Sequence, residues 1–237
     1  MHFARYDRIV AHYPSMWPLL VPGYEPILNA MLDVVEVRDN KPRSILDVGC
    51  GPGSATIAVA PACHSEGRVT VVDGSPRMAA AAAEMLDGYI RDTFVGDFTE
   101  AGTADCVFRD ATYDLILCSF ALHHLDDGTK RRTIDAMGSS LQPGGLLLLA
   151  DEVVSDRPAG WEVVERIRGR IIQKHLDAGD ITEEFWHLET SLEPEAQLPF
   201  LPTRIDDMVS FLARAGLAVS CPVSILGSAL LVALKPK

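Results

Sequence analysis

The sequence contains no long apolar run and few cations for its length. The longest apolar runs, residues 146–150 and 229–234, are far too short to cross a bilayer. Lysine and arginine together number 21 against 33 acids, and the net charge of −12 argues against non-specific binding to nucleic acid or to an anionic membrane. Charged residues also stand near the beginning, where a signal peptide would need its apolar core. We therefore expect a cytoplasmic protein that does not bind membranes.

Cysteine pairs with metal-site spacing are also missing. The five cysteines show no C-x-x-C spacing, and their number is odd. This pattern argues against a zinc site or a disulfide framework and favours reduced thiols in an intracellular protein, so we expect no metal. A chain of 237 residues is long enough to bury a sizeable core as one domain, residues 1–237, without disulfides or a structural metal.

Short apolar strands alternate with helical patterns over most of the chain. Predicted strands are 44–48, 68–72, 93–95, 113–119 and 146–150, and predicted helices are 27–37, 54–60, 76–86, 129–141 and 204–215. Alternation at this spacing is typical of right-handed βαβ units and predicts an α/β fold with a doubly wound parallel sheet. Two last strands, 217–221 and 228–234, are too close together for a helical crossover, so we expect them to pair antiparallel.

Two segments interrupt this alternation. Residues 1–26 are rich in aromatic residues and prolines, and prolines so closely spaced exclude one long helix. This segment is either an N-terminal arm packed on the core or a lid over a ligand, and it can serve as both. Residues 153–202 contain an amphipathic helix near 161–176 and a less regular stretch. Because variable loops at the carboxyl edge of a sheet set specificity, we expect this helical insertion to cover the substrate.

Three alternating glycines follow the first predicted strand. Gly49, Gly51 and Gly53 can adopt positive φ and let a ligand approach the backbone, and the helix that follows presents free N–H groups. The G-x-G-x-G spacing differs from the G-x-G-x-x-G of dinucleotide sites, and no G-K-[ST] of a P-loop is present. By itself, the turn predicts an adenine-nucleoside cofactor without identifying it.

Carboxylates end the next two predicted strands. Asp73 stands about 20 residues after the glycines, where it can accept hydrogen bonds from both ribose hydroxyls. The alternative is a capping role at the helix that follows. Asp97 stands beside Phe98, where it can bind an adenine amino group, and the alternative is an ordinary turn aspartate.

In order and spacing these pieces resemble the class I S-adenosylmethionine-dependent methyltransferases. The matching stretches lie within about residues 40–152 and are 46–53, 71–76, 96–97, 113–125 and 141–145. The resemblance implies a Rossmann-like seven-stranded sheet with an antiparallel last strand, and S-adenosyl-L-methionine as cofactor. The cofactor-binding residues that it implies are Tyr24, Asp47, Gly49, Gly51, Gly53, Asp73, Gly74, Met78, Asp97, Phe98, Ser119 and Phe120. For Met78, the alternative to cofactor binding is a position in the hydrophobic core.

Both edges of the chain resemble more closely the carboxy-S-adenosylmethionine synthases of tRNA wobble-uridine modification. The similar stretches are 21–24 and 227–235, and the first implies that Tyr24 contacts the cofactor. The same family implies an arginine, before the penultimate helix, that binds the added carboxylate of the cofactor. Residues 187–193 contain no arginine, and their acids would repel a carboxylate. The resemblance therefore supports the fold and disfavours that particular activity.

Methyl transfer from a sulfonium needs little chemistry from the protein, because the cofactor brings the reactivity. The protein aligns the nucleophile, excludes water and in some cases removes a proton. His123 and His124 follow the fourth strand and are the candidate bases, since histidine titrates near neutral pH. Candidate substrate contacts are Tyr13, Trp17, Asp151, Glu152, His175, Trp186 and His187. The alternative for each is a core, capping or solvated position.

These features together predict a methyltransferase that acts on oxygen or nitrogen of a small molecule. Asp151 and Glu152, at the end of the fifth strand, could hold a cationic amine of such a substrate. A homodimer is compatible with the sequence. Two alternatives stay open: a tRNA-pathway enzyme, for carboxy-cofactor synthesis or RNA methylation, and a cofactor-binding protein without transferase activity.

Overall fold

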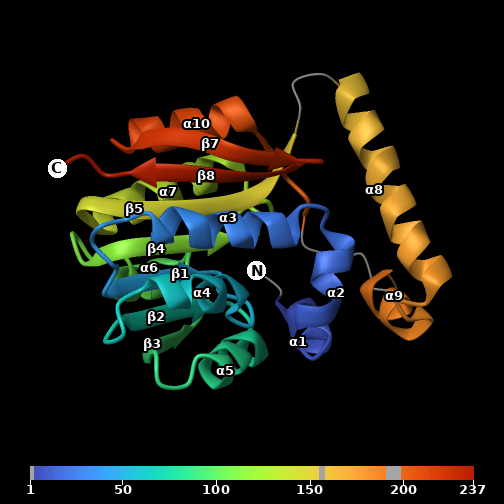
Figure 1. Cartoon of the computed structure of the whole chain (residues 1–237), viewed down its shortest axis with the longest axis horizontal. Helices are drawn as coiled ribbons and strands as arrows, with labels where there is room; N and C mark the ends of the chain where they lie inside the picture. Colours follow the sequence, from blue (N-terminus) through green and yellow to red (C-terminus); the bar gives the residue numbers. More distant parts are fainter. Residues whose placement is uncertain (1–2, 155–157, 191–198) are drawn as a thin grey trace.

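A single mixed sheet runs through the protein, as Figure 1 shows for the computed structural model, which describes residues 3–154, 158–190 and 199–237. Its strand order is β3-β2-β1-β4-β5-β8-β7. The strands are β1 (Ser44–Val48), β2 (Arg68–Asp73), β3 (Ile90–Val95), β4 (Tyr113–Ser119), β5 (Leu141–Val154), β7 (Ala218–Ile225) and β8 (Ser228–Leu234). β1 to β5 pair in parallel, and β8 is antiparallel to both of its neighbours. The predicted doubly wound sheet with an antiparallel last strand is confirmed.

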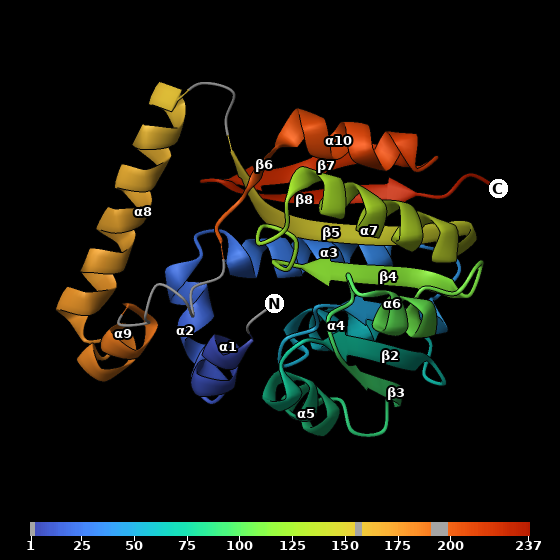
Figure 2. The same cartoon turned by 180° about the vertical axis from the view of Figure 1, so that it is seen from behind.

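Helices cover both faces of the sheet (Figures 1 and 2). On one face lie α3 (Tyr24–Glu36), α4 (Ser54–Val59), with the 3₁₀ turn η1 (Ala60–Ala62) after it, and α5 (Pro76–Met85). On the other lie α6 (Ala101–Val107), α7 (Asp127–Ser140) and α10 (Ile205–Arg214). Successive residues of a central strand alternate between the two cores: Leu115 and Leu117 of β4 pack on the first face, and Ile116 and Cys118 on the second. All four are 0% exposed, as expected of a sheet covered on both sides.

The two irregular segments meet at the carboxyl end of the parallel strands. There, α1 (Ala4–Ile9) packs against α5, and α2 (Tyr13–Leu20) packs against α8 (Pro158–Ala178). The next helix, α9 (Glu183–Thr190), lies beside α1 (Figures 1 and 2). The chain then returns through β6 (Thr203–Arg204), which pairs in parallel with the end of β5. Among the described residues, none of the helices combines the length and apolar composition that a membrane span needs.

Most element boundaries agree with the prediction to within a few residues, and two differences are notable. β5 begins at residue 141 and not 146, because the Pro-Gly-Gly stretch continues the strand through an irregular register against β4. α6 was not predicted, since its seven residues are too few for a clear helical period. The described part of this segment, residues 3–26, contains the short helices α1 and α2, with Pro18 inside α2, and the start of α3, so the exclusion of one long helix is confirmed.

Candidate active site

The glycine turn between β1 and α4 requires glycine for two reasons. Gly49, Gly51 and Gly53 have φ of 65°, 52° and 90°, which L side chains rarely adopt. A Cβ on Gly49 would also lie 2.5 Å from the Cβ of Ala121, whereas a Cβ on Gly51 would meet nothing within 4 Å. The backbone of the turn at Gly51 is therefore open to a ligand.

Asp73 ends β2 and supports this turn. Its Oδ2 accepts a hydrogen bond from the Gly51 N–H and its Oδ1 accepts one from the Ser75 N–H, both at 2.8 Å. Burial raises the pKa of Asp73, and the two amides act in the opposite direction. The cap of α5 is Ser75, whose Oγ accepts from the Met78 N–H. Asp73 thus fixes the glycine turn, and its carboxylate faces the same side as the turn.

A pocket opens between the turn and the ends of β2, β3 and β4. Its lining includes most of the residues predicted to bind a cofactor, namely Gly49, Gly51, Asp73, Gly74, Met78, Asp97, Phe98, Ser119 and Phe120. Tyr13 and His124 also line it. Asp97 lines the pocket, and its Oδ1 accepts hydrogen bonds from the N–H and the hydroxyl of Thr99, as in an ordinary turn.

Three residues predicted at the cofactor lie behind the pocket lining. Gly53 precedes α4 and packs on Leu86. Tyr24 is 6% exposed, and its ring lies 5.4 Å from that of Phe120, so it supports a lining residue from behind. Phe120 itself has a φ of 53°, which is strained for an aromatic residue and is common at functional sites.

Asp47, the third of these residues, is a buried carboxylate with one unpaired oxygen. Its Oδ2 accepts a hydrogen bond of 2.7 Å from the Thr56 hydroxyl, while Oδ1 has no partner in the described part of the chain. Burial raises the pKa of Asp47 to about 7, with the Thr56 hydroxyl lowering it and the charge of Asp73 raising it further. A buried acceptor of this kind calls for a hydrogen-bond donor or a positive charge.

The first described residues cover the pocket. The Phe3 ring lies on Gly74, where an added Cβ would come within 2.2 Å of its Cζ. Asp7 fixes α1 to the start of α5, because its Oδ1 accepts hydrogen bonds from the Ser75 hydroxyl at 2.6 Å and from the Arg77 N–H at 3.2 Å. Phe3 also lines the pocket. The sequence marked this arm as aromatic-rich but gave no signal that singled out Phe3.

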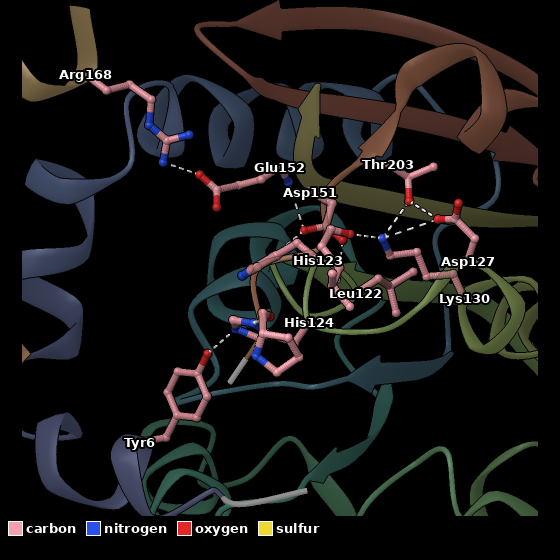
Figure 3. A network of polar contacts seen from close by, with 12 residues as sticks. Tyr6, Leu122, His123, His124, Asp127, Lys130, Asp151, Glu152, Arg168 and Thr203 are labelled. Atoms are coloured by element: carbon pink, nitrogen blue, oxygen red, sulfur yellow. Dashed lines mark hydrogen bonds and ion pairs between the residues drawn. The ribbon is translucent and has the colours of Figure 1, made fainter. Parts of the chain in front are cut away.

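His124 has hydrogen-bond partners on both ring nitrogens. Its Nδ1 lies 2.8 Å from the carbonyl oxygen of Pro199, which can only accept, so Nδ1 carries the proton. Its Nε2 therefore accepts from the Tyr6 hydroxyl, at 2.6 Å (Figure 3). His124 thus connects the arm to the end of the insertion, and Tyr6, one of the aromatic residues of the arm, lines the pocket.

His123 forms a different contact, with Asp151 of β5. Nδ1 of His123 lies 2.6 Å from Oδ1 of Asp151, and both side chains are buried. The Asp151 carboxylate is held further by the N–H groups of Leu122, at 3.0 Å, and Glu152, at 2.8 Å (Figure 3). Because a carboxylate accepts hydrogen bonds, Nδ1 of the neutral imidazole carries the proton and Nε2 is left as a proton acceptor.

Glu152 is already paired with a cation. Arg168 of α8 reaches across to donate to Oε1 of Glu152, and the exposed fractions of these two side chains are 14% and 8% (Figure 3). Asp151 is thus bound to histidine and Glu152 to arginine, so both acids considered for a substrate amine already have partners within the protein. The sequence did not indicate Arg168, because nothing local relates it to a glutamate 16 residues earlier.

Two aromatic residues predicted at the substrate stack on each other in α2. The rings of Tyr13 and Trp17 lie 4.4 Å apart at an angle of 16°. Tyr13 reaches the pocket, whereas Trp17 is buried in the core, with its Nε1 unpaired in the described part of the chain.

The residues predicted from the insertion are not gathered at this pocket. His175 pairs with Asp180 at 2.9 Å at the end of α8, and Trp186 packs against the core from α9. The side chain of His187 lies outside the described residues, as do residues 191–198 of the insertion.

Comparison with known proteins identifies the central part of the chain. Residues 45–145 match the methyltransferase domain family. A carboxy-S-adenosyl-L-methionine synthase from Aliivibrio salmonicida is 28% identical over 149 residues, which make up 62% of this chain and 60% of that protein. One from Yersinia pestis is 29% identical over 148 residues, 62% of this chain and 54% of that protein. The chain spans little more than half the length of these curated relatives.

Solved structures extend the likeness over nearly the whole chain. The CurJ carbon methyltransferase matches 94% of this chain and 58% of its own, with a TM-score of 0.64 and 15% identity. An O-methyltransferase family protein from Burkholderia thailandensis matches 99% of this chain and 59% of its own, with a TM-score of 0.64 and 18% identity. At these identities the likeness establishes the fold alone.

Proposed function

We propose that this chain, a class I S-adenosylmethionine-dependent methyltransferase by its fold and by its domain at residues 45–145, methylates an oxygen or a nitrogen of a small molecule. The observation that carries this proposal is the buried His123–Asp151 pair, located after β4 and at the end of β5, beside the cofactor pocket. A histidine held in this way is suited to remove a proton from a hydroxyl or an amine.

Membership of this family implies S-adenosyl-L-methionine as the cofactor, and the site fits that molecule. The unpaired Oδ1 of buried Asp47 calls for the kind of positive charge that the cofactor carries. The open backbone at Gly51 leaves room beside the turn. Asp73, 9% exposed at the pocket wall, keeps carboxylate lone pairs for hydroxyl donors. When bound, the cofactor supplies an electrophilic methyl group.

The residues of the chain then have three tasks in the proposed reaction. Asp151 holds the proton on Nδ1 of His123, so that Nε2 can take the proton of the acceptor as the new bond forms. Phe3 and Tyr6 of the arm, together with Phe120, surround the pocket and exclude water. Residues 1–26 act in this proposal as a lid, and the 153–202 insertion contributes to the substrate side.

Cofactor affinity should rise with pH through neutrality. The pKa of Asp47 is raised to about 7 in the cofactor-free protein, so this carboxyl is mostly neutral at pH 6 and mostly ionised at pH 8. A cationic cofactor binds the ionised form, and we therefore expect about tenfold tighter binding at pH 8 than at pH 6, with a proton released on binding at pH 6. Calorimetry in two buffers of different ionisation enthalpy measures both quantities.

Asp47→Asn is the control for this pH dependence. The asparagine cannot titrate, so any change in affinity that persists in the variant comes from the cofactor or from other groups. An affinity that varies with pH equally in both proteins would rule out Asp47 as its source.

Carboxy-S-adenosylmethionine synthesis is the second candidate, because the curated relatives named above are enzymes of that name. Against it stands the lack of arginine at residues 187–193, of which 191–193 lie outside the described residues. The two candidates separate in a single assay. The protein is incubated with methyl-labelled S-adenosylmethionine, once with prephenate and once with a small-molecule extract, and the products are resolved by mass spectrometry.

Methyl transfer predicts label in an extract compound and a cofactor product that has lost its methyl group. A cofactor that instead gains the mass of a carboxyl group with prephenate would support the synthase and reject our proposal. RNA methylation would place the label in added tRNA. Cofactor binding without any product in these reactions would favour a binding protein.

A further inference from the structure

Lys130 is a fully buried cation on α7, close to the histidine–aspartate pair. It is 1% exposed, although lysine is almost never fully buried unless it is paired. Its Nζ donates hydrogen bonds to Oγ1 of Thr203, at 2.5 Å, and to the carbonyl oxygen of Leu201, and it lies 3.8 Å from Oδ1 of Asp127. Burying an ion costs on the order of several kcal/mol, so a lysine in this place requires an explanation.

The charge of Lys130 acts on Asp151. Burial lowers the pKa of the Lys130 ammonium, whereas the carboxylates of Asp151, Asp127 and Asp126 act in the opposite direction and favour its charged form. The Asp151 carboxylate that attracts the ammonium also binds Nδ1 of His123 through its Oδ1. Figure 3 shows Asp151 between the two, with His123 on one side and Lys130 on the other.

Lys130 also anchors the segment that covers His123. The Leu201 N–H donates to the carbonyl oxygen of His123 at 2.6 Å, and the Phe200 ring lies 5.8 Å from the His123 ring. The Leu201 carbonyl and the Thr203 hydroxyl both accept from Lys130, so one side chain holds residues 199–204 from the side of α7. β6, which contains Thr203, then pairs with the end of β5, two residues after the Asp151 carboxylate.

We propose that Lys130 is a positioning residue of the methyl-transfer site: its ammonium sets the basicity of His123 through Asp151, and its hydrogen bonds fix residues 199–204 over the imidazole. The inference rests on the proposed function, in which His123 accepts a proton. Lys130 does not line the cofactor pocket, so it acts through these neighbours. The other charged or titratable groups around His123 are Asp126 at the N-cap of α7, Asp127 of α7, Asp151 and Glu152 of β5, Arg168 of α8 through Glu152, and His124 with Tyr6 of α1.

The test follows the titration of the His123 ring by NMR in the cofactor-free protein, so it needs no methyl acceptor. Lys130→Met keeps the chain length and removes the cation, which should raise the titration midpoint of His123 by about one pH unit. Lys130→Arg keeps the cation and should leave the midpoint within about 0.3 unit. His123→Gln assigns the signal among the seven histidines.

An unchanged His123 midpoint in a Lys130→Met protein with a native circular dichroism spectrum would overturn the proposal. If that variant does not fold, Asp127→Asn replaces it, because the Asp127 side chain is 62% exposed and tolerates substitution. Removing this negative charge should lower the midpoint by a few tenths of a unit, and a rise or no change would count against the role of Lys130. A failure of the proposed function would give a different result. The His123 midpoint would still move in Lys130→Met, but the His123→Gln protein would transfer methyl groups at the rate of the unaltered protein.

Discussion

Replacing His123 with glutamine should lower kcat by about 10²- to 10⁴-fold, the usual contribution of a general base. The glutamine amide can still donate a hydrogen bond to Asp151, so the local structure is kept, but it cannot accept a proton from the substrate. Cofactor affinity should stay within a few-fold, because His123 does not line the cofactor pocket. The measurement is the rate of label transfer from S-adenosylmethionine to the acceptor found in the extract.

His124→Gln is the matched control. Its ring nitrogens are bound to Tyr6 and Pro199, so the substitution should disturb the arm and weaken cofactor binding without removing the base. We expect a loss in kcat below about tenfold for this variant, smaller than any that removes proton transfer. If kcat fell equally in the two variants, or fell further in His124→Gln, the assignment of His123 as the base would be wrong.

Asp73→Ala should weaken cofactor binding by about 100-fold or more. The carboxylate holds the N–H groups of Gly51 and Ser75, and in our proposal it also accepts from the ribose hydroxyls. Each charge-assisted hydrogen bond contributes roughly 1.5–3 kcal/mol, and two of them account for at least a factor of 100. Titration calorimetry with S-adenosylmethionine measures the change, and a melting curve checks that the variant is folded.

Asp105→Ala serves as the control for the loss of an acid, because Asp105 is an exposed residue of α6. Its Kd should equal that of the unaltered protein. A folded Asp73→Ala protein whose Kd stays within about tenfold would mean that the ribose lies elsewhere. Asp73→Asn keeps the volume of the side chain, and its Kd should lie between those of Asp73→Ala and Asp105→Ala.

The glycine turn and the strand-end acids that line the pocket were predictable because they follow a local rule. Asp73 and Asp97 each end a strand of a parallel sheet, and the carboxyl ends of such strands meet at the same edge. Gly49 was recognisable for a similar reason, since its positive φ and close approach to Ala121 belong to a short turn pattern. Strand ends and glycine spacing are therefore sufficient to predict most of the residues in this half of the site.

The other half depends on contacts between distant residues. His123 and His124 are equivalent as a sequence pair, and their distant partners distinguish them: Asp151 binds His123, whereas Tyr6 and Pro199 bind His124. In the sequence, Lys130 is one of several charged residues on an amphipathic helix. Only the structure shows that it donates hydrogen bonds to Leu201 and Thr203. Packing that brings segments about 70 residues apart together leaves no local signature, so these partners could not be inferred.

The attachment of α1 also bears on the order in which the protein assembles. This helix is made before any of its partners, because Asp7 binds the start of α5 some 70 residues later and Tyr6 binds His124, 118 residues later. His124 in turn binds Pro199, 75 residues further on. During synthesis the arm has no complete docking place until most of the chain has emerged from the ribosome. We therefore expect closure over the pocket to be one of the last steps of folding, after the sheet that it covers has formed.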